Sequence, residues 1–202
     1  MTSIESVTLE VPDPTLANAF YTAAFGVNTQ VRLRAADAPT TGFRGFTLSL
    51  TVSQPATVKG LIGAAVDAGA TPLKPAARSF WGYGGVVRAP DGTIWKVATS
   101  AKKDTGPATR QIDEIVLLLG VADMAASKRF YLDRGLAVAK SFGRKYVEFA
   151  TPSSPVKLAL YGHRALAKDA GVSPDGSGSH RIVIGSPVGP FTDPDAFAWE
   201  AA

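Results

Sequence analysis

A short pattern that occurs twice constrains the fold of this chain more than any other feature. Residues 90–96 read Pro-Asp-Gly-Thr-Ile-Trp-Lys, and residues 194–200 read Pro-Asp-Ala-Phe-Ala-Trp-Glu. In each copy a turn leads into a short apolar strand that carries a Trp and then a charged residue, Lys96 or Glu200. Side chains alternate between the two faces of a strand, so this charge points away from the core that holds the Trp. In a sheet curled into a cup the charge would face the cavity, where a carboxylate is a candidate ligand or base.

The opening of the chain is repeated as well. Alternating polar and apolar residues at 4–11 predict a strand, and residues 112–115 repeat its start. The helix predicted after the first strand carries Phe-Tyr at residues 20–21 and ends at Gly26, and Phe-Tyr returns at residues 130–131. These repeats predict an α+β fold built from two similar halves.

We place the boundary between the halves in residues 101–110. This segment contains Lys, Asp, Gly and Pro, and its only apolar side chains are alanines and that proline, which is typical of a linker. We therefore expect a first half over residues 1–100 and a second half over residues 111–202. Further strands are expected near residues 29–34, 46–52, 137–140, 145–149, 156–161 and 180–184, with a short extended segment at residues 72–75 and an aromatic and glycine-rich turn into a strand at residues 80–87. Further helices are expected near residues 55–69 and 165–170, and loops at residues 36–44 and 173–179.

The composition narrows the classes of function. With 202 residues, of which 46% are hydrophobic and 19% charged, the chain can form one domain or two small ones. The net charge is +4, but Lys and Arg are scattered, with the tightest cluster at Lys102 and Lys103, so we expect no nucleic-acid partner. The absence of cysteine excludes disulfides and thiolate zinc sites, and no apolar run reaches membrane-spanning length. We expect a cytoplasmic protein with a small-molecule ligand or substrate, no membrane partner, and a homodimer as an open alternative.

Taken in order, the strand, the helix with Phe-Tyr, the later strands and the Pro-Asp turn resemble the vicinal oxygen chelate superfamily of glyoxalases, bleomycin-resistance proteins and extradiol dioxygenases. The best local matches are residues 45–100 and 111–135. The resemblance implies paired βαβββ modules whose sheets curl round a cavity. It also implies that each half is trimmed. Residues 31–44 are short where the family usually has two more strands, and a helix and strands are missing between Ile184 and Pro194.

Metal-dependent members of this superfamily take ligands from the first strand, from the start of a later strand and from the end of the last strand. The resemblance puts Ser6, Thr47 and Lys96 at these positions in the first half, and Glu114, His180 and Glu200 in the second. The first set makes a poor metal site because it contains a cation. The second suits Fe(II), Mn(II), Ni(II) or Zn(II), although a glutamate replaces the family's usual first histidine. Each of the three also has a simpler interpretation. Glu114 can be a glutamate that faces the solvent, His180 a histidine at the start of a strand with one hydrogen bond, and Glu200 a solvated glutamate near the C-terminus.

Two functions remain open at this point. The first is a metal-dependent lyase or isomerase in which Glu114, His180 and Glu200 hold the metal and Glu114 or Glu200 moves a proton. The second is a metal-free binding protein, similar to the bleomycin-resistance members, that holds a drug-like ligand between aromatic walls. The candidate ligand-binding residues are then Phe80, Trp81, Tyr83 and Lys96. A bound divalent metal and no cofactor at all are equally consistent with the sequence.

Overall fold

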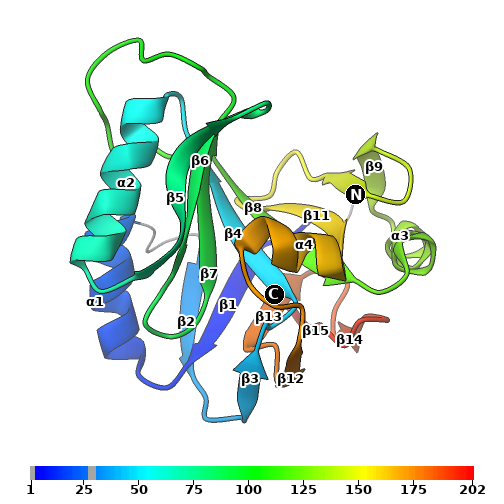
Figure 1. The fold of residues 1–202 in the computed structure, drawn as a ribbon. Helices are drawn as coiled ribbons and strands as arrows, with labels where there is room; N and C mark the ends of the chain where they lie inside the picture. Colours follow the sequence, from blue (N-terminus) through cyan, green and yellow to red (C-terminus); the bar gives the residue numbers. More distant parts are fainter. Residues whose placement is uncertain (1–2, 27–30) are drawn as a thin grey trace.

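The computed structural model describes residues 3–26 and 31–202 (Figure 1). The first half contains β1 (Ser6–Val11), α1 (Pro14–Ala24), β2 (Val31–Ala35), β3 (Thr40–Gly42), β4 (Phe46–Thr51), α2 (Pro55–Asp67), β5 (Thr71–Ser79), β6 (Gly82–Arg88) and β7 (Ile94–Thr99). The second half contains β8 (Glu114–Val121), α3 (Met124–Asp133), β9 (Ala137–Ser141), β10 (Tyr146–Ala150), β11 (Lys157–Gly162), α4 (His163–Ala170), β12 (Gly176–Gly178), β13 (Ile182–Ser186), β14 (Phe191–Thr192) and β15 (Ala198–Ala201). Of the strand expected over residues 29–34, residues 29 and 30 lie outside the described part.

Two large sheets organise the α+β fold, and each contains strands from both halves. The larger sheet has eight strands in the order β5-β6-β7-β4-β8-β11-β10-β9. The smaller has five, in the order β14-β15-β13-β1-β2. The halves meet in the larger sheet through the antiparallel pair β4 and β8, and in the smaller through the antiparallel pair β1 and β13. Because both sheets cross the boundary between halves, the division into two halves stays a prediction about the sequence repeat.

Both trimmed segments lie next to strands of the five-stranded sheet. Between β2 and β4 the chain forms only the three-residue β3, and between β13 and β15 it forms only the two-residue β14. The eight-stranded sheet instead takes β4 to β7 from the first half and β8 to β11 from the second. The two short segments implied by the resemblance therefore lie next to the five-stranded sheet, and the eight-stranded sheet has four strands from each half.

Helices α1, α2 and α3 cover the core side of the sheets. Asp13 and Asp123 cap α1 and α3 in the same way, since each carboxylate accepts hydrogen bonds from the backbone N–H groups two and three residues further on. Apolar side chains of the three helices pack with inward-facing residues of both sheets in one continuous core. Within residues 3–26 and 31–202, no helix has the length and apolar character needed to cross a membrane.

The repeated Phe-Tyr and Pro-Asp motifs meet in space in both halves. The Oη of Tyr21 on α1 donates to Oδ2 of Asp91 at 2.5 Å. The Oη of Tyr131 on α3 donates to Oδ2 of Asp193, so the second copy uses the aspartate before the proline. Each tyrosine ring also contacts the Trp of its motif, with ring centroids 5.4 Å apart for Tyr21 and Trp95 and 5.6 Å apart for the second pair. The motif that dominates the sequence is therefore a structural tie between helix and turn.

The predicted linker is held in place by one buried side chain. Residues 100–113 form neither helix nor strand. The Oε1 of Gln54 accepts from the backbone N–H groups of Thr105 at 2.7 Å and Gly106 at 3.1 Å, and its Nε2 donates to Pro107 O at 2.7 Å. These bonds fix the connection against the N-terminus of α2.

Three local predictions differ from the structure. The short extended segment expected at residues 72–75 is the nine-residue strand β5, which pairs with β6 through two register shifts. The loops expected at residues 36–44 and 173–179 each contain a three-residue strand, β3 and β12, and these pair with each other. Gly, Ser and Thr runs indicate loops in a sequence, but here the two runs lie side by side and exchange backbone hydrogen bonds.

Candidate functional site

The two glutamates predicted as metal ligands lie on different sheets, and each has a cationic partner. Glu114 starts β8 in the eight-stranded sheet, and its Oε1 accepts from Nζ of Lys157 on β11 at 2.5 Å. Glu200 lies on β15 in the five-stranded sheet, and both its oxygens accept from Nη2 of Arg34 on β2 at 2.8 Å. The expectation that Glu114 and Glu200 converge on one cavity is therefore not met.

The imidazole of His180, the third predicted ligand, contacts two backbone carbonyl oxygens. Its Nδ1 lies 2.6 Å from the carbonyl oxygen of Arg44, and its Nε2 lies 3.0 Å from that of Asp195. The ring also stacks on Phe197, with centroids 4.1 Å apart. Both ring nitrogens therefore point at backbone carbonyl oxygens, and not at a site shared with Glu114 and Glu200. His180 joins the chain before β4 to the chain before β13.

The candidate ligands of the first half, Ser6, Thr47 and Lys96, also lie in structural positions. The Nζ of Lys96 on β7 donates to Oδ2 of Asp169 on α4 at 2.7 Å, and not to Glu114 or Glu200. Thr47 is buried on the neighbouring strand β4. Ser6 is buried on β1 in the other sheet, and its hydroxyl has no hydrogen-bond partner among the described residues.

The aromatic residues predicted to line a cavity lie at a hairpin tip instead. Phe80 and Trp81 connect β5 and β6, and their exposed fractions are 82% and 83%. Tyr83 lies inside β6, where its Oη donates to Ala76 O at 3.0 Å and its ring packs against the core. The prediction of aromatic walls is wrong in this respect. The sequence predicted a turn into a strand over residues 80–87, and β6 does start at Gly82, but the turn exposes Phe80 and Trp81 instead of directing them into a cavity.

Helix α4 covers part of the face of the eight-stranded sheet that points away from the main core. Its Leu166, Ala167 and Ala170 pack in a second, smaller apolar cluster with residues that include Val86 and Ile94. The Lys96 ion pair with Asp169 and a hydrogen bond from Nζ of Lys74 to Lys168 O at 2.7 Å attach the helix to β7 and β5. Figure 1 shows α4 crossing in front of β4, β8 and β11. This face is therefore covered at one end and open at the other.

The open end of this face carries a group of polar side chains that we call the polar strip: Glu114, Tyr146, Glu148, Lys157 and Tyr161. Leu118 and Tyr161 contact the α4 cluster. Because side chains alternate along a strand, Glu114 shares the face of Leu118 on β8, and Lys157 shares the face of Tyr161 on β11. Register pairs Tyr146 with Tyr161, which places Tyr146 and Glu148 of β10 on this face too.

Hydrogen bonds and ion pairs connect neighbouring members of the polar strip. The Oη of Tyr146 donates to Oε2 of Glu148 at 2.8 Å, and the rings of Tyr146 and Tyr161 have centroids 6.1 Å apart. Burial raises the pKa of the Tyr146 phenol well above its ordinary value, and the hydrogen bond to Glu148 raises it further, with a smaller effect from the charge of Glu114. Tyr146 therefore keeps its proton and acts as a donor. Together the strip offers a phenol donor, two carboxylates and an ammonium to one molecule.

Sequence reasoning found only Glu114 of these five residues. Tyr146 and Glu148 carried a signal in their spacing, since they lie two apart in a predicted strand, as do polar residues on one face of any strand. Lys157 gave no such signal, because its pairing with Glu114 depends on the parallel register of β8 and β11, which is not local in sequence.

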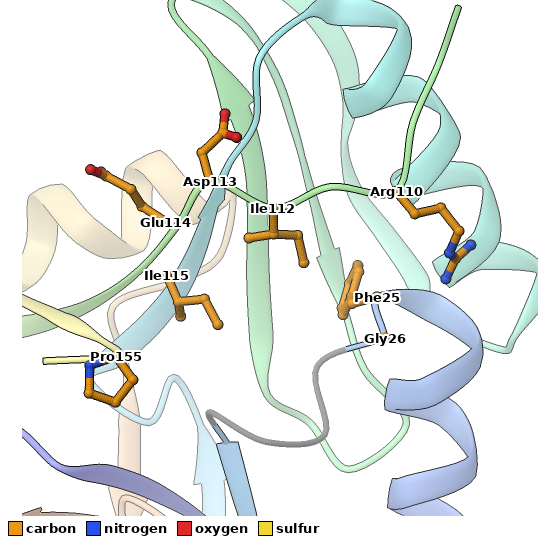
Figure 2. Close-up of a pocket in the computed structure, with 8 residues that line it drawn as sticks. All are labelled: Phe25, Gly26, Arg110, Ile112, Asp113, Glu114, Ile115 and Pro155. Atoms are coloured by element: carbon orange, nitrogen blue, oxygen red, sulfur yellow. The ribbon is translucent and has the colours of Figure 1, made fainter.

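A pocket of about 240 Å³ lies beside the polar strip, between the end of α1 and the chain that enters β8. Figure 2 shows that Ile115, Phe25 and Pro155 surround it, while the carboxylates of Asp113 and Glu114 point to the opposite side of the chain. Arg110, which also borders it, donates to the last backbone carbonyls of α1. The exposed lining of the pocket is mostly polar, and two of the ionisable side chains around it, Arg110 and Glu114, are already bonded within the chain.

Comparison with known proteins identifies the fold. Neither a protein-family model nor a curated protein sequence matches this chain. Among solved structures, a variant of glyoxalase I from Zea mays aligns over 98% of this chain and 92% of its own, with a TM-score of 0.63 and 14% identity. Another structure of glyoxalase I from Zea mays aligns over 92% and 75%, with a TM-score of 0.59 and 17% identity. A putative dioxygenase from Bacillus subtilis aligns over 91% and 69%, with a TM-score of 0.54 and 12% identity.

This chain has the fold of the vicinal oxygen chelate superfamily. The vicinal oxygen chelate fold carries many chemistries, so the likeness establishes architecture and not activity. Metal-dependent members need a set of free donors, and the three candidate positions of this chain do not provide one. Within residues 3–26 and 31–202, no three His, Asp or Glu side chains are grouped closely enough to hold an ion. The donor set Glu114, His180 and Glu200 therefore does not fit a metal.

Proposed function

We propose that this chain is a metal-independent protein that binds a small polar molecule on the eight-stranded sheet, at the polar strip. One observation carries the proposal. The glutamates at the predicted metal positions are each bonded to a cation of the chain itself, Lys157 for Glu114 and Arg34 for Glu200. Each carboxylate therefore has a partner within the chain, and the two lie on different sheets, so they do not offer a shared set of donors to one ion.

The chemistry of the polar strip indicates the class of ligand. Lys157 can exchange Glu114 for an anionic group of the ligand, because their ion pair is partly exposed and such pairs are weak. Glu148 can accept from a hydroxyl or amine, and Tyr146 remains a proton donor. These groups suit a small molecule that carries a carboxylate or phosphate together with hydrogen-bond donors. In this proposal the protein binds and orients the ligand, and it supplies no nucleophile.

Ligand-observed NMR with a panel of small carboxylates, amino acids and phosphate esters tests the location of the site. For any compound that binds, Lys157→Met and Glu148→Gln should each weaken binding about tenfold, since a hydrogen bond to a charged group contributes about 1.5–3 kcal/mol. Arg34→Met is the matched control, because it breaks the equivalent ion pair on the other sheet and should leave binding unchanged. Compounds whose affinity is the same in all four proteins would contradict the proposed site.

Metal analysis separates this proposal from the alternative of a metal-dependent lyase or isomerase. Protein purified without a histidine tag and incubated with Zn(II), Ni(II), Mn(II) or Fe(II) should retain much less than one ion per chain after dialysis. Its melting temperature should be the same with and without the ions. Retention of one ion per chain that is lost in Glu114→Ala or Glu200→Ala would instead favour the metal-dependent enzyme.

A further inference from the structure

The tip of the β5–β6 hairpin exposes two large aromatic side chains, which we call the aromatic tip: Phe80 and Trp81. Their rings contact each other edge to face, with centroids 5.0 Å apart and an interplanar angle of 90°. Figure 1 shows the hairpin reaching past the ends of the neighbouring strands. The other two tryptophans, Trp95 and Trp199, are 0% and 3% exposed. Exposing two adjacent aromatic rings to water on a projecting turn is unfavourable, and the packing of the fold does not explain this exposure.

The hairpin is held firmly against the end of β7. Gly82 follows the aromatic tip with φ of +135°, and a Cβ at this position would lie 2.0 Å from Thr99 O. Only glycine allows the turn to approach β7 so closely. The backbone N–H of Trp81 also bonds to Oγ of Ser79 at 3.2 Å. The aromatic tip is therefore presented by a closely packed β-turn.

Three exposed basic residues lie on the segments next to the aromatic tip. Arg78 precedes it on β5 and is exposed. Lys102 and Lys103 are exposed in the chain that leaves β7, whose Ser100 lies beside Gly82. The acid that follows them, Asp104, accepts at its Oδ1 from Ala56 N at the start of α2 at 2.6 Å. The segments next to the two rings therefore carry three exposed cations.

The shape of the aromatic tip selects among its candidate partners. A stable protein–protein interface buries about 800 Å² on each partner, far more than two side chains supply. Stacking with single-stranded nucleic acid needs a ring face open to each base, but the edge of one ring here lies against the face of the other. A lipid surface needs only a few aromatic side chains at the headgroup level and nearby cations to attract anionic lipids.

We propose that the aromatic tip, with Arg78, Lys102 and Lys103, binds reversibly to the surface of membranes rich in anionic lipids. Phe80 and Trp81 enter the headgroup region while the three cations contact lipid phosphates and carboxylates. The polar strip lies on β8, β10 and β11, away from β5 and β6 in the strand order of the eight-stranded sheet.

Tryptophan fluorescence of the intact chain tests this directly, because Trp81 is its only exposed tryptophan. With vesicles of phosphatidylcholine and phosphatidylserine in equal parts, the emission should shift to shorter wavelength, and brominated lipids should quench it. Pure phosphatidylcholine vesicles should give neither effect. Trp81→Phe should retain sedimentation with the anionic vesicles but lose the fluorescence shift, which assigns the signal to this side chain.

Variants in a vesicle sedimentation assay separate the two contributions. Phe80→Ser with Trp81→Ser should lower the partition coefficient about tenfold or more. Lys102→Gln and Lys103→Gln should each lower the partition coefficient about fivefold, and added salt should lower it too. Phe142→Ser, which changes a side chain 64% exposed on the β9–β10 hairpin, is the control and should leave binding unchanged. The proposal is overturned if anionic vesicles leave the emission unshifted, or if Trp81→Ser changes a self-association equilibrium and not sedimentation.

Discussion

The eight-stranded sheet and the five-stranded sheet are assembled by the same rule but differ in completeness. Each joins strands of the first half to strands of the second across one antiparallel pair. The eight-stranded sheet has four strands from each half, whereas the segments between β2 and β4 and between β13 and β15 add only the two-residue β14 to the five-stranded sheet. One repeated pattern therefore yields one broad sheet and one narrow sheet. The complete sheet keeps a broad face, and both α4 and the polar strip lie on it.

The repeated tryptophans give the largest test of this difference. Trp95 lies on β7, inside the eight-stranded sheet, while Trp199 lies on β15 next to the two-residue edge strand β14. Removing a buried Trp side chain costs about 3–5 kcal/mol, and more where the surroundings cannot close in. Trp95→Ala should lower the free energy of unfolding by about 4 kcal/mol and Trp199→Ala by about 3 kcal/mol. Urea denaturation measures both. A larger loss for Trp199→Ala would show that the narrow sheet is the better packed of the two.

The two tyrosine–aspartate ties provide the next comparison. Tyr131→Phe should destabilise the fold by about 2 kcal/mol, because Asp193 is buried and loses a donor. Tyr21→Phe should cost about 1 kcal/mol, because its partner Asp91 also attracts the guanidinium of Arg44, which donates to Asp91 O at 2.6 Å. Thermal unfolding of the two variants at neutral pH gives the values. Equal losses would mean that Arg44 contributes nothing to the first tie.

Alkaline pH should lower the free energy of unfolding through both buried tyrosines, Tyr21 and Tyr131. Burial, followed by the nearby Asp91 or Asp193 carboxylate, raises the pKa of Tyr21 and of Tyr131 well above the ordinary value. Above pH ~10 the unfolded chain releases these protons while the folded chain keeps them, so stability falls as pH rises, by up to about 1.4 kcal/mol per pH unit for each tyrosine. Denaturation curves at several pH values should show this slope. Tyr21→Phe or Tyr131→Phe should each flatten it, and a variant that leaves the slope unchanged would contradict the assignment.

The ion pairs on the two outer faces should have the smallest effects. Lys96→Met and Arg34→Met each remove one partner of a partly exposed pair, and each should cost about 0.5 kcal/mol or less. Hydrogen exchange separates them. Lys96→Met should speed exchange of the α4 amides, since Lys96 bonds to Asp169, and Arg34→Met should leave α4 unchanged. Unaltered α4 exchange in Lys96→Met would show that apolar packing alone holds this helix.

Local sequence signals predicted the elements but not how they associate. The alternation at residues 4–11 and the Phe-Tyr helices can be predicted because they depend on neighbouring residues, whereas the two short segments were implied by the family resemblance. The sequence repeat could not reveal that β1 pairs with β13, since register between distant strands is set by the whole core. This is why the predicted site combined Glu114 of one sheet with Glu200 of the other.

The misplaced aromatic residues have a different cause. The sequence placed Phe80 and Trp81 in a turn that leads into a strand, where aromatic side chains are more often core or cavity lining, but the turn leaves both exposed. The residues of a turn do not show by themselves whether their side chains fold back onto the protein or face the solvent. His180 failed for a third reason, because its partners are backbone carbonyls, which every residue possesses and no motif marks.

Strand pairing across the whole chain has a consequence for synthesis on the ribosome. Ser6 is opposite Gly185, so β1 finds its antiparallel partner only after the whole segment between them has been translated. Until then the nascent chain carries an open strand edge that invites aggregation, and its long-range contacts favour slow folding. Pulse proteolysis of ribosome-stalled chains should show protection of β1 only after β13 has emerged. Early protection would mean that the first half folds without its distant partner.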